Sequence, residues 1–416
     1  MNISKIYKIF EQYPFICTDS RKIINGSIFI SLKGKNFNGN KFALKAIQQG
    51  CSYAIVDEKK YDQSSKTILV KNCLNTLQKL AIKHREKINI PVIGITGTNG
   101  KTTSKELINQ VLSTKFHVYA TKGNLNNHIG VPLSILEINK EHDIAIIEMG
   151  ANKQGDIKFL CKISNPNFGI ITNVGIAHIE GFKNLQGVVE TKCELYQHIE
   201  EKNGMLFVNA EDQILLQKSK AINRKTYGKN KNINLINSGY FITLNYNNNI
   251  IKSNLLGDYQ YYNLMLTIAI GTYFKVPIKM IKKSIKNYFP KNNRSQIVKT
   301  DNNTIILDAY NANPSSMDAT LKSFTKQKFK NKLCILGDML ELGKASFNHH
   351  KLVLELTEKL NLPTIFIGKE FKKVVQSSYE SNEEFIKKII KNPIKNKSIL
   401  LKGSRGISLE KLVEYL

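Results

Sequence analysis

The sequence predicts an α/β protein of three domains arranged around a central parallel sheet. Its 416 residues exceed what one hydrophobic core usually supports, and we expect domains at residues 1–87, 88–296 and 297–416. Beyond residue 92, short apolar runs rich in β-branched residues alternate with helical patterns. This alternation is typical of parallel strands joined by right-handed helical crossovers. A glycine-rich turn between one such run and a helix marks an edge of the sheet where a ligand is expected.

Composition favours a protein without membrane spans or disulfide bonds. The hydrophobic fraction is 42%, and no apolar run approaches the ~20 residues of a membrane span. Residues 1–10 lack the apolar core and cleavage site of a secretory signal. The six cysteines are widely spaced, with no C-x-x-C pair, which favours free thiols in a reducing cytoplasm.

The formal net charge of +28 has two explanations. A basic chain attracts polyanions, either nucleic acid or a polyphosphate substrate. The lysines are nevertheless spread along the chain among Asn and Ile, without a zinc-finger spacing, an aromatic RNA-binding signature or a dense basic arm. This distribution favours the codon bias of an A/T-rich genome over a polyanion partner, and the charge alone leaves that second explanation open.

The first domain is predicted to be a small α/β unit that binds a substrate. We expect strands at 28–32, 53–56 and 67–70, and a helix at 42–49 that Gly50 ends. Thr18, Ser20 and Arg21 place two hydroxyls and a guanidinium close together, which suits an anionic ligand. An ordinary polar turn explains the same three residues, so the pattern alone leaves this site open.

The second domain opens with a strand at 92–96, a glycine loop and a helix start. This order is the construction of a phosphate cradle, in which backbone N–H groups and a helix N-terminus face the anion. Lys101 is expected to meet phosphate oxygen, and the Thr102 hydroxyl to hold Mg²⁺. The strict G-x-x-x-x-G-K-[ST] spacing fails because position 95 is Ile, but the flanking strand and helix favour a P-loop. The residues of the loop are Gly97, Thr98, Asn99, Gly100, Lys101, Thr102 and Thr103.

Three further strands of this domain end in polar clusters. The segment after a strand at 117–120 carries Asn126 and Asn127, and the apolar strand 143–148 ends in Glu148. A carboxylate there is placed to complete a Mg²⁺ shell beside the P-loop. The strand that begins at 169 leads to His178, a metal or phosphate ligand or simply a surface residue. Because parallel strands end at one sheet edge, the convergence of these clusters favours one shared site.

The rest of the second domain carries weaker signals. A helix at 185–199 contains Lys192, and its charged face is most simply a solvated surface. Residues 204–250 are expected to form a strand meander with loose turns, followed by an apolar helix at 264–274 and a loop at 289–296.

The third domain is predicted to be a Rossmann-like α/β unit. Apolar strands that begin at 304 and 333 both run into polar loops, and shorter strands are expected at 364–367 and 398–401. Polar strand ends of this kind line nucleotide or substrate sites in α/β sheets.

Taken together, five motifs resemble the Mur ligase family, the ATP-dependent amide ligases of peptidoglycan precursor synthesis. They are Thr18-Asp19-Ser20-Arg21, the glycine loop, Asp308-Ala309-Tyr310-Asn311-Ala312-Asn313-Pro314, Gly337-Asp338-Met339-Leu340-Glu341-Leu342-Gly343 and Lys402-Gly403-Ser404-Arg405. Within the family, the combination is most similar to the ligase that joins D-alanyl-D-alanine to UDP-N-acetylmuramoyl-tripeptide. The Asp-Asn-Pro-Arg motif typical of the ligase for the third amino acid is not found.

The resemblance implies roles for individual residues. The glycine loop would bind ATP, with Lys101 catalytic, and Thr102, Glu148 and His178 would hold Mg²⁺. Lys192 is similar to the family's carbamylated lysine, whose anionic carbamate is an oxygen ligand for Mg²⁺; with Lys101 and His178 it would be catalytic. The resemblance assigns ATP contacts to Asn263, Arg294 and Asp308. It assigns substrate contacts to Thr18, Ser20, Arg21, Asn126, Asn127, Asn311 and Asn313. Gln260 and Asn38 depart from the family's usual Asn and Asp at their positions.

The resemblance therefore predicts an ATP- and Mg²⁺-dependent amide ligase that acts in the cytoplasm as a monomer, without nucleic acid or membrane insertion. Three other functions fit parts of the pattern: another ligase of the superfamily such as a folyl-polyglutamate synthase, a P-loop switch or transport ATPase, and a nucleic-acid-binding protein. ADP release that depends on both the UDP-tripeptide and D-alanyl-D-alanine distinguishes the first two from the predicted ligase. A steeply salt-dependent affinity for nucleic acid would favour the third.

Overall fold

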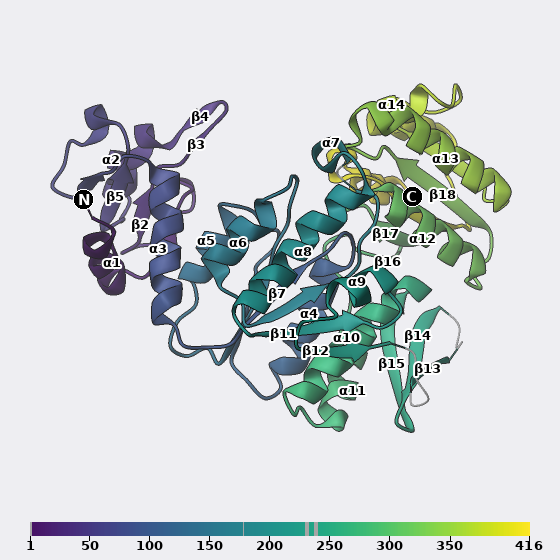
Figure 1. Ribbon diagram of the computed structural model, residues 1–416. Helices are drawn as coiled ribbons and strands as arrows, with labels where there is room; N and C mark the ends of the chain where they lie inside the picture. The colour runs from purple at the N-terminus through teal and green to yellow at the C-terminus, as the bar shows by residue number, and fades with distance from the viewer. Residues whose placement is uncertain (1, 178, 229–232, 237–239) are drawn as a thin grey trace.

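The computed structural model describes residues 2–177, 179–228, 233–236 and 240–416. It has the predicted architecture, in which an N-terminal and a C-terminal α/β domain flank a central domain built on a parallel sheet (Figure 1). The domain boundaries at 87 and 296 remain predictions. The C-terminal sheet begins with β16 (Gln296–Lys299). Within the described residues, no helix combines the length and the apolar character needed to cross a membrane.

The central sheet has the strand order β12-β11-β10-β7-β9-β8, and its neighbouring strands are all parallel. This order places β7, which precedes the glycine loop, between β10 and β9, so the three polar strand ends predicted at 97, 148 and 172 are neighbours. The strands are β7 (Val92–Thr96), β8 (Val118–Ala120), β9 (Ile144–Glu148), β10 (Phe168–Ile171), β11 (Met205–Asn209) and β12 (Arg224–Tyr227). The helices are α4 (Lys101–Leu112), α5 (Gly130–Leu136), α6 (Asp156–Ser164), α7 (Ile179–Phe182), α8 (Leu185–Glu201), α9 (Gln213–Lys218), α10 (Tyr261–Tyr273) and α11 (Ile278–Lys286).

The meander predicted for residues 204–250 is wrong in its first half. The apolar run of β11 is buried and pairs in parallel with β10, while β12 adds the next strand of the central sheet. Helix α9 lies between them and begins at Asp212, whose carboxylate accepts a hydrogen bond from the Leu215 N–H (3.0 Å). The antiparallel meander starts later, in the order β13-β14-β15 (Ile233–Ile236, Phe241–Tyr246 and Asn249–Leu256).

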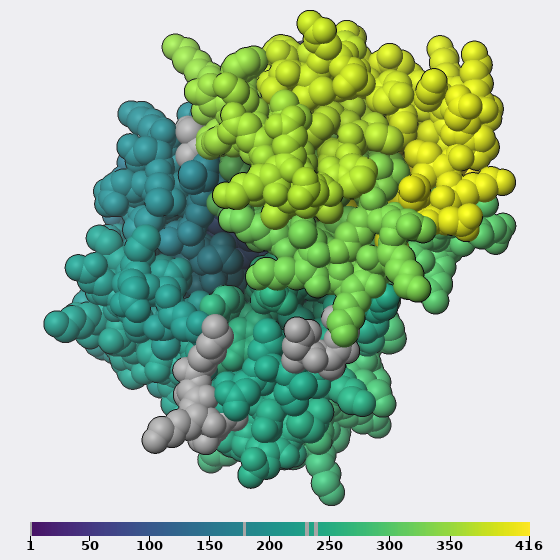
Figure 2. All heavy atoms as spheres, turned by 90° about the vertical axis from the view of Figure 1, so that its right-hand side faces the viewer, coloured from purple at the N-terminus to yellow at the C-terminus, as the bar shows by residue number. Residues whose placement is uncertain are grey.

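The C-terminal domain has the strand order β16-β17-β20-β18-β19, in which β16 is antiparallel to β17 and the other pairs are parallel. Figure 2 shows a hollow between this domain and the central domain. The strands after β16 are β17 (Thr304–Asp308), β18 (Lys332–Gly337), β19 (Thr364–Ile367) and β20 (Ser398–Lys402). The helices are α12 (Pro314–Lys326), α13 (Ser346–Lys359), α14 (Lys369–Lys372) and α15 (Asn382–Lys391).

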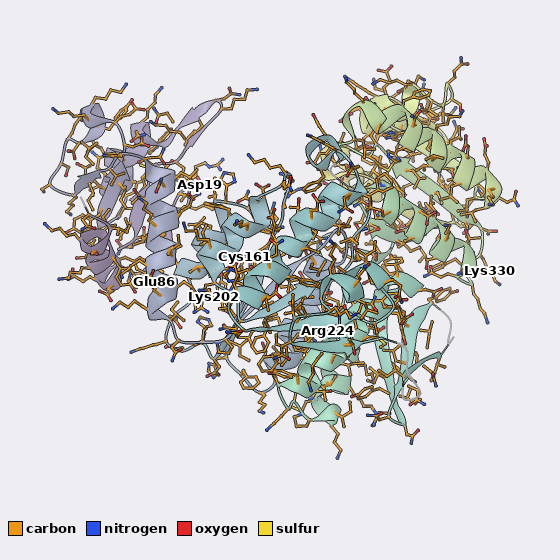
Figure 3. All side chains as sticks on the ribbon, in the orientation of Figure 1. Asp19, Glu86, Cys161, Lys202, Arg224 and Lys330 are labelled. Atoms are coloured by element: carbon orange, nitrogen blue, oxygen red, sulfur yellow. The ribbon has the colours of Figure 1, made fainter. Side chains whose placement is uncertain are left out.

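The N-terminal domain carries the parallel sheet β1-β2-β5-β6 and a short hairpin, β3-β4. Figure 3 labels Asp19, in the turn after β1, on the side of this domain that faces the rest of the molecule in that view. The strands are β1 (Ile16–Cys17), β2 (Ile28–Ile30), β3 (Lys33–Gly34), β4 (Phe37–Asn38), β5 (Tyr53–Val56) and β6 (Thr67–Leu69). The helices are α1 (Ile3–Gln12), α2 (Ala43–Gln48) and α3 (Cys73–Lys87).

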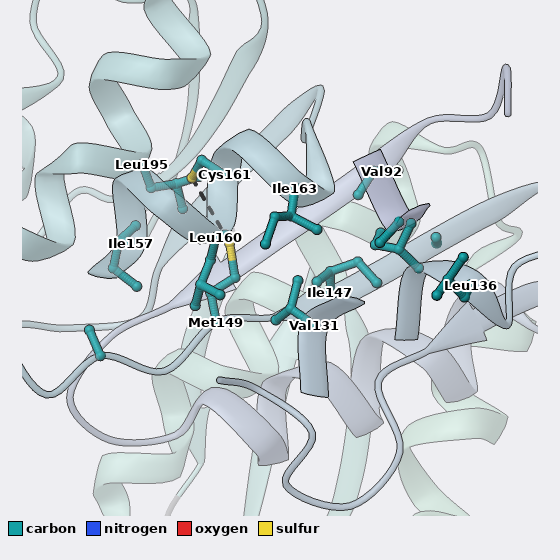
Figure 4. Close-up of a cluster of buried hydrophobic side chains, with 14 of the residues drawn as sticks. Val92, Val131, Leu136, Ile147, Met149, Ile157, Leu160, Cys161, Ile163 and Leu195 are labelled. Atoms are coloured by element: carbon teal, nitrogen blue, oxygen red, sulfur yellow. Dashed lines mark hydrogen bonds between the residues drawn. The ribbon is translucent and has the colours of Figure 1, made fainter. Parts of the chain in front are cut away.

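Helix α3 joins the N-terminal domain to the central domain through one continuous core. Apolar side chains of α1 and α3 belong to the same cluster as those of α5, α6 and α8, part of which Figure 4 shows. At the end of α3, the buried Arg85 guanidinium donates to the backbone oxygens of Ser164 (2.9 Å), Ile88 (2.7 Å) and Asn165 (3.0 Å). Because a buried cation needs such acceptors, Arg85 fixes α3 against the central sheet.

Candidate active site

The glycine loop connects β7 to α4, and its shape depends on close backbone packing. All five residues of β7 are buried, which fixes where the loop begins. Gly97 has φ +140°, and a Cβ there would lie 2.0 Å from the Thr172 hydroxyl oxygen. That hydroxyl donates to the Asn99 backbone oxygen (2.6 Å), so the missing side chain of Gly97 lets β10 support the loop.

Lys101 begins α4 and its amine lies over the loop. Its Nζ donates to the backbone oxygens of Gly97 (2.7 Å) and Thr98 (3.0 Å). Burial lowers the pKa of Lys101, Glu148 opposes this shift and Arg294 adds to it. A buried ammonium of this kind is stabilised by an anion, which is what a P-loop lysine receives from phosphate.

Glu148, at the end of β9, lies beside the start of α4. The residue is 1% exposed, and its two carboxylate oxygens accept hydrogen bonds from Thr102 Oγ1 (2.9 Å) and Asn126 Nδ2 (2.8 Å). The Lys105 amine lies 3.7 Å from the same carboxylate. Within the described residues, no group of three or more His, Cys, Asp or Glu side chains is arranged so that it could hold a metal ion. A carboxylate and a hydroxyl are nonetheless oxygen donors of the type that Mg²⁺ prefers, usually with water and phosphate in its shell.

Asn126 and Asn127 both line a cavity, and their side chains also make hydrogen bonds within the protein. The Asn126 amide holds Glu148, as described above. The Asn127 side-chain oxygen accepts hydrogen bonds from the N–H groups of Ile129 (3.0 Å) and Gly130 (2.9 Å), at the start of α5.

Lys192 lies in the middle of α8, and its side chain is buried. The charged face of this helix was expected to be a solvated surface, so that expectation is wrong at Lys192. The residue is 3% exposed, and its amine lies 5.4 Å from the centre of the Phe182 ring. Burial lowers the pKa of Lys192 to about 7, the charge of Lys101 adds to this effect, and Asp156 and Glu194 oppose it. Near neutral pH, a large share of these amines is therefore unprotonated and nucleophilic.

Asp308 ends β17 in the C-terminal domain and forms a buried ion pair. Its Oδ2 accepts a hydrogen bond from Lys402 Nζ (2.6 Å), and its Oδ1 accepts one from the Ser295 N–H (3.2 Å). Nearby, the Arg294 guanidinium stacks 3.7 Å from the centre of the Tyr310 ring. Arg294 and Asp308, which the resemblance assigned to ATP, therefore both have side chains fixed by contacts within the protein.

The start of α12 is hydrogen-bonded to the glycine loop across the domain boundary. Asn313 accepts a hydrogen bond from the Ser316 N–H (2.8 Å), and its amide donates to Asn99 Oδ1 (2.9 Å). Ser315 Oγ accepts from the Ile176 N–H (2.8 Å). Asn313 thus positions the loop and the C-terminal domain relative to each other.

Asn263 supports the loop from the other side. Its side-chain oxygen accepts a hydrogen bond from Ser104 Oγ (3.1 Å), and its amide donates to Gln260 Oε1 (2.5 Å). Gly100 has φ +79°, and a Cβ there would lie 2.8 Å from Asn263 Oδ1. Glycine at this position therefore allows the loop to pack against α10.

These elements enclose a cavity of about 720 Å³ between the central and C-terminal domains. Most of the predicted site residues meet there, which is the convergence that the strand ends predicted. Its walls include Gly97, Thr98, Asn99, Gly100, Lys101, Thr102, Thr103, Asn126, Asn127, Glu148, Lys192, Asn263, Arg294, Asp308 and Asn311. His178 lies outside the described residues.

Thr18, Ser20 and Arg21 lie apart from this cavity, in the turn between β1 and β2. The Arg21 side chain is 85% exposed, and it donates to both oxygens of Asp19 through Nε (2.9 Å) and Nη2 (2.8 Å). These hydrogen bonds hold the pKa of the Asp19 carboxyl well below its usual range. The structure therefore presents this turn as a separate surface on the N-terminal domain.

Several cavity residues were not among the predicted site residues, notably Lys402, Tyr310, Asp156 and Glu341. Lys402, Tyr310 and Glu341 belong to motifs that the sequence analysis quoted. Asp156, however, stands alone in the sequence. It begins α6, and its carboxylate accepts hydrogen bonds from the N–H groups of Asn152 (2.9 Å) and Lys153 (3.1 Å). A helix-start aspartate of this kind is a common structural feature, so no sequence signal marks it as a site residue.

Family models match nearly the whole chain. The model described as the Mur ligase middle domain matches residues 95–271. The model of the Mur ligase glutamate ligase domain matches residues 293–405, and that of the Mur ligase family catalytic domain matches residues 12–96.

Curated relatives and solved structures agree with these matches. The UDP-N-acetylmuramoyl-tripeptide--D-alanyl-D-alanine ligase of Bacillus subtilis is 32% identical, over 96% of this chain and 92% of its own length. The ligase of the same name from Buchnera aphidicola is 34% identical, with the same two coverages. A crystal structure of MurF from Acinetobacter baumannii has a TM-score of 0.85 at 28% identity and covers 96% of this chain and 92% of its own.

MurF from Thermotoga maritima, solved in complex with ADP, has a TM-score of 0.82 at 27% identity, with 96% of each chain covered. A folylpolyglutamate synthase of Mycobacterium tuberculosis has a TM-score of 0.63 at 12% identity, which shows a shared fold and nothing more. Because the domain models and full-length relatives agree along the chain, this protein belongs to the Mur ligase family.

Proposed function

We propose that this protein is an ATP-dependent ligase that joins D-alanyl-D-alanine to UDP-N-acetylmuramoyl-tripeptide in peptidoglycan precursor synthesis. The observation that carries the proposal is the cavity in which the glycine loop, Glu148, Lys192 and Arg294 meet Asp308 of the C-terminal domain. Relatives at 32% and 34% identity carry this ligase name over almost their full length. ADP bound to the Thermotoga maritima neighbour supports the use of ATP.

In the first step, the terminal carboxylate of the tripeptide attacks the γ-phosphorus of ATP, and ADP leaves with the bond electrons. The product is an acyl phosphate, in which phosphate replaces the poor leaving group hydroxide. We infer that Lys101 and Arg294, which both line the cavity, offset the charge on the transferring phosphoryl group. Asn263 and Thr172 hold the loop in shape, so that the reacting groups are positioned before the reaction.

Thr102 and Glu148 are the residues that would hold Mg²⁺ in this cavity, since both present oxygen atoms there. Bound Mg²⁺ would neutralise phosphate charge during the transfer. We further propose that Lys192 reacts with CO₂ to form a carbamate. Carbamate formation requires a neutral amine, and the lowered pKa of about 7 supplies one near neutral pH.

In the second step, the amine of D-alanyl-D-alanine attacks the acyl carbon, an amide bond forms and phosphate leaves. We assign Thr18, Ser20 and Arg21 to the uridine nucleotide end of the first substrate. We assign Asn126 and Asn127 to its cavity end and Asn311 to substrate contact at the C-terminal wall. Asn313 acts on substrate indirectly, because its amide is bonded to Asn99.

We also propose that the protein acts in the cytoplasm as a monomer and binds no nucleic acid. Its six cysteines are all free and buried, which fits a reducing compartment. Sedimentation at increasing protein concentration tests the monomer. A binding titration with DNA and RNA at two salt concentrations tests the absence of a nucleic-acid partner.

The deciding experiment measures ADP release with each substrate alone and with both together. Amide formation, followed by mass spectrometry, is expected only when ATP, the UDP-tripeptide and D-alanyl-D-alanine are all present. Lys101→Ala should reduce ADP release by about 10³-fold, because it removes the cation at the transferring phosphate, while affinity for the UDP-tripeptide persists. A rate of ADP release that is the same with and without the UDP-tripeptide and the dipeptide would instead favour a P-loop ATPase.

Lys192→Ala provides a separate test of the carbamate. Activity is expected to fall and to recover partly when a short carboxylate such as acetate is added, because a carboxylate supplies the lost oxygen ligand. Unreduced activity in the variant would contradict the assignment.

A further inference from the structure

A loop of the C-terminal domain, residues 338–343, brings a carboxylate to the Lys192 end of the cavity. Glu341 lines the cavity, and the short helix that follows it (Gly343–Ala345) packs against α7. A Cβ on Gly343 would lie 3.4 Å from the Glu180 side chain of α7. The same helix carries Phe182, whose ring faces the Lys192 amine. The contacts therefore place Glu341 near the Lys192 end of the cavity.

The backbone of Glu341 lies in a conformation that side chains disfavour. Its φ is +65°, in the left-handed region, and among the described residues it is the one acidic residue with a positive φ. Residues held in this region cluster at functional sites, where the surrounding structure fixes them. Glu341 has a partner within the protein, with which an incoming ligand would compete.

Hydrogen bonds on both sides of the loop fix this conformation. The Asp338 carboxylate accepts from the N–H groups of Glu370 and Phe371 (2.9 Å each), at the start of α14. The Met339 N–H donates to His350 Nε2 (3.0 Å), and the Leu340 N–H donates to Ser404 Oγ (2.9 Å). The residue before Glu341 is thus held in place by the segment after β20.

The charges around the cavity explain why the second substrate needs this carboxylate. Lys101, Arg294 and Lys402 line the cavity, and their positive charges repel the ammonium group of a dipeptide. Among the described residues, four carboxylates line the cavity: Glu148, Asp156, Asp308 and Glu341. Glu148 is bonded to Thr102 and Asn126, Asp308 to Lys402, and Asp156 to two backbone N–H groups. Glu148 and Asp308 are thus bonded to residues beside the glycine loop and in β20, and Asp156 is bonded to the backbone before α6.

We propose that Glu341 binds the amine of D-alanyl-D-alanine and accepts the proton that this amine loses. This inference rests on the proposed function. An α-amine has a pKa of about 8, so about one molecule in ten carries a neutral, nucleophilic amine at pH 7. Glu341 accepts a hydrogen bond from the amine and orients it toward the acyl carbon. As the C–N bond forms, the acyl C–O bond to phosphate breaks and phosphate leaves with its electron pair. The proton on nitrogen passes to the Glu341 carboxylate and then to water.

The test compares two nucleophiles on the same acyl phosphate. Glu341→Gln removes the charge, and Glu341→Gly removes the side chain while relieving the left-handed backbone, so the loop is expected to keep its shape. In both variants, kcat/KM for D-alanyl-D-alanine should fall about 10²-fold, the usual contribution of a positioned proton acceptor. Hydroxylamine, an amine that is largely unprotonated at neutral pH, should trap the acyl phosphate as hydroxamate at the wild-type rate. Glu180→Gln is the matched control, because this carboxylate lies next to the loop but outside the cavity walls, and it should leave both rates unchanged.

Two results would overturn the inference while leaving the proposed function intact. One is a variant that retains kcat/KM for the dipeptide within about threefold of the wild-type value. The other is an equal loss of hydroxamate and amide formation, which would show that the loop acts on the first step. A wild-type protein that forms no amide from the UDP-tripeptide and D-alanyl-D-alanine would overturn both the proposed function and this inference.

Discussion

Replacing Lys402 by methionine is expected to destabilise the C-terminal domain strongly. Lys402 ends β20 directly opposite Asp308, which ends the neighbouring strand β17. The Lys402 side chain is 2% exposed and the Asp308 side chain 16%, and their charged atoms lie 2.6 Å apart. Lys402→Met keeps the length and apolar stem of the side chain but leaves the carboxylate without its cation.

The size of the effect follows from the desolvation of both charges. At an effective dielectric constant of about 20, two unit charges 2.6 Å apart attract by about 6 kcal/mol. Taking each ion out of water costs several kcal/mol, so the intact pair contributes little net stability. Removing one partner leaves the other buried charge uncompensated, which typically costs about 3–5 kcal/mol. Asp308 keeps one backbone N–H donor and some exposure, so we expect the lower end, about 3 kcal/mol.

The loss of unfolding free energy can be measured by urea unfolding, monitored through hydrogen exchange of the backbone amides in β17 and β20. These two strands report on the C-terminal domain alone. The double variant Lys402→Met with Asp308→Asn removes both charges and should recover to within about 1 kcal/mol of the wild-type stability. Lys322→Met is a suitable control. It breaks an exposed pair with Asp318, worth less than about 1 kcal/mol. The reasoning is refuted if Lys402→Met costs less than about 1 kcal/mol, or if the double variant is no more stable than the single one.

Three further predictions concern the metal, the domain contact and pH. Glu148→Gln should raise the Mg²⁺ concentration for half-maximal ADP formation at least about tenfold, and EDTA should abolish that activity until Mg²⁺ is restored. Asn313→Asp keeps the side-chain oxygen that caps α12 but loses the donor to Asn99, so KM for ATP should rise while stability changes by less than about 1 kcal/mol. Burial lowers the pKa of His84 below its usual 6.5, and this effect outweighs the opposing hydrogen bond to the Ile138 backbone oxygen and the charge of Glu11. The folded state therefore binds fewer protons than the unfolded state, and the free energy of unfolding should decrease as pH falls below 6.5. In His84→Gln, urea titrations at several pH values should give a flatter dependence.

The fold was largely predictable where the sequence carries a buried apolar run. The strands at 53–56 and 364–367 have the predicted bounds, and the helix predicted at 185–199 extends to Glu201. The prediction failed at β11 and β12, because an apolar run does not reveal which sheet it joins. Pairing with β10 depends on tertiary packing, and residues 204–250 were therefore placed in one meander.

The candidate site was predictable where it depends on local chain order. Lys101 and Thr102 follow a strand and a glycine turn, so their place at a helix start is a short-range property. The lowered pKa of Lys192 is a long-range property, since it arises from burial and from the charge of Lys101 on another helix. The Lys402–Asp308 pair depends on the register of strands 94 positions apart in the chain. Apolar runs and local motifs carry no information on such a register.

The arrangement of charges implies that ATP binding and the domain contact stabilise each other. Lys101 and Arg294 both line the cavity, and the positive charge of Arg294 lowers the pKa of Lys101. The phosphates of ATP carry the opposite charge, so their binding relieves this repulsion at the point where Asn99 and Asn313 already join the domains. A ligand at 100 times its Kd stabilises the state that binds it by about 2.7 kcal/mol. Because the cavity walls come from both domains, that energy favours the docked arrangement over any in which the domains separate. The loop around Glu341 belongs to the C-terminal domain, so the same coupling keeps it at the cavity wall when a nucleotide is bound.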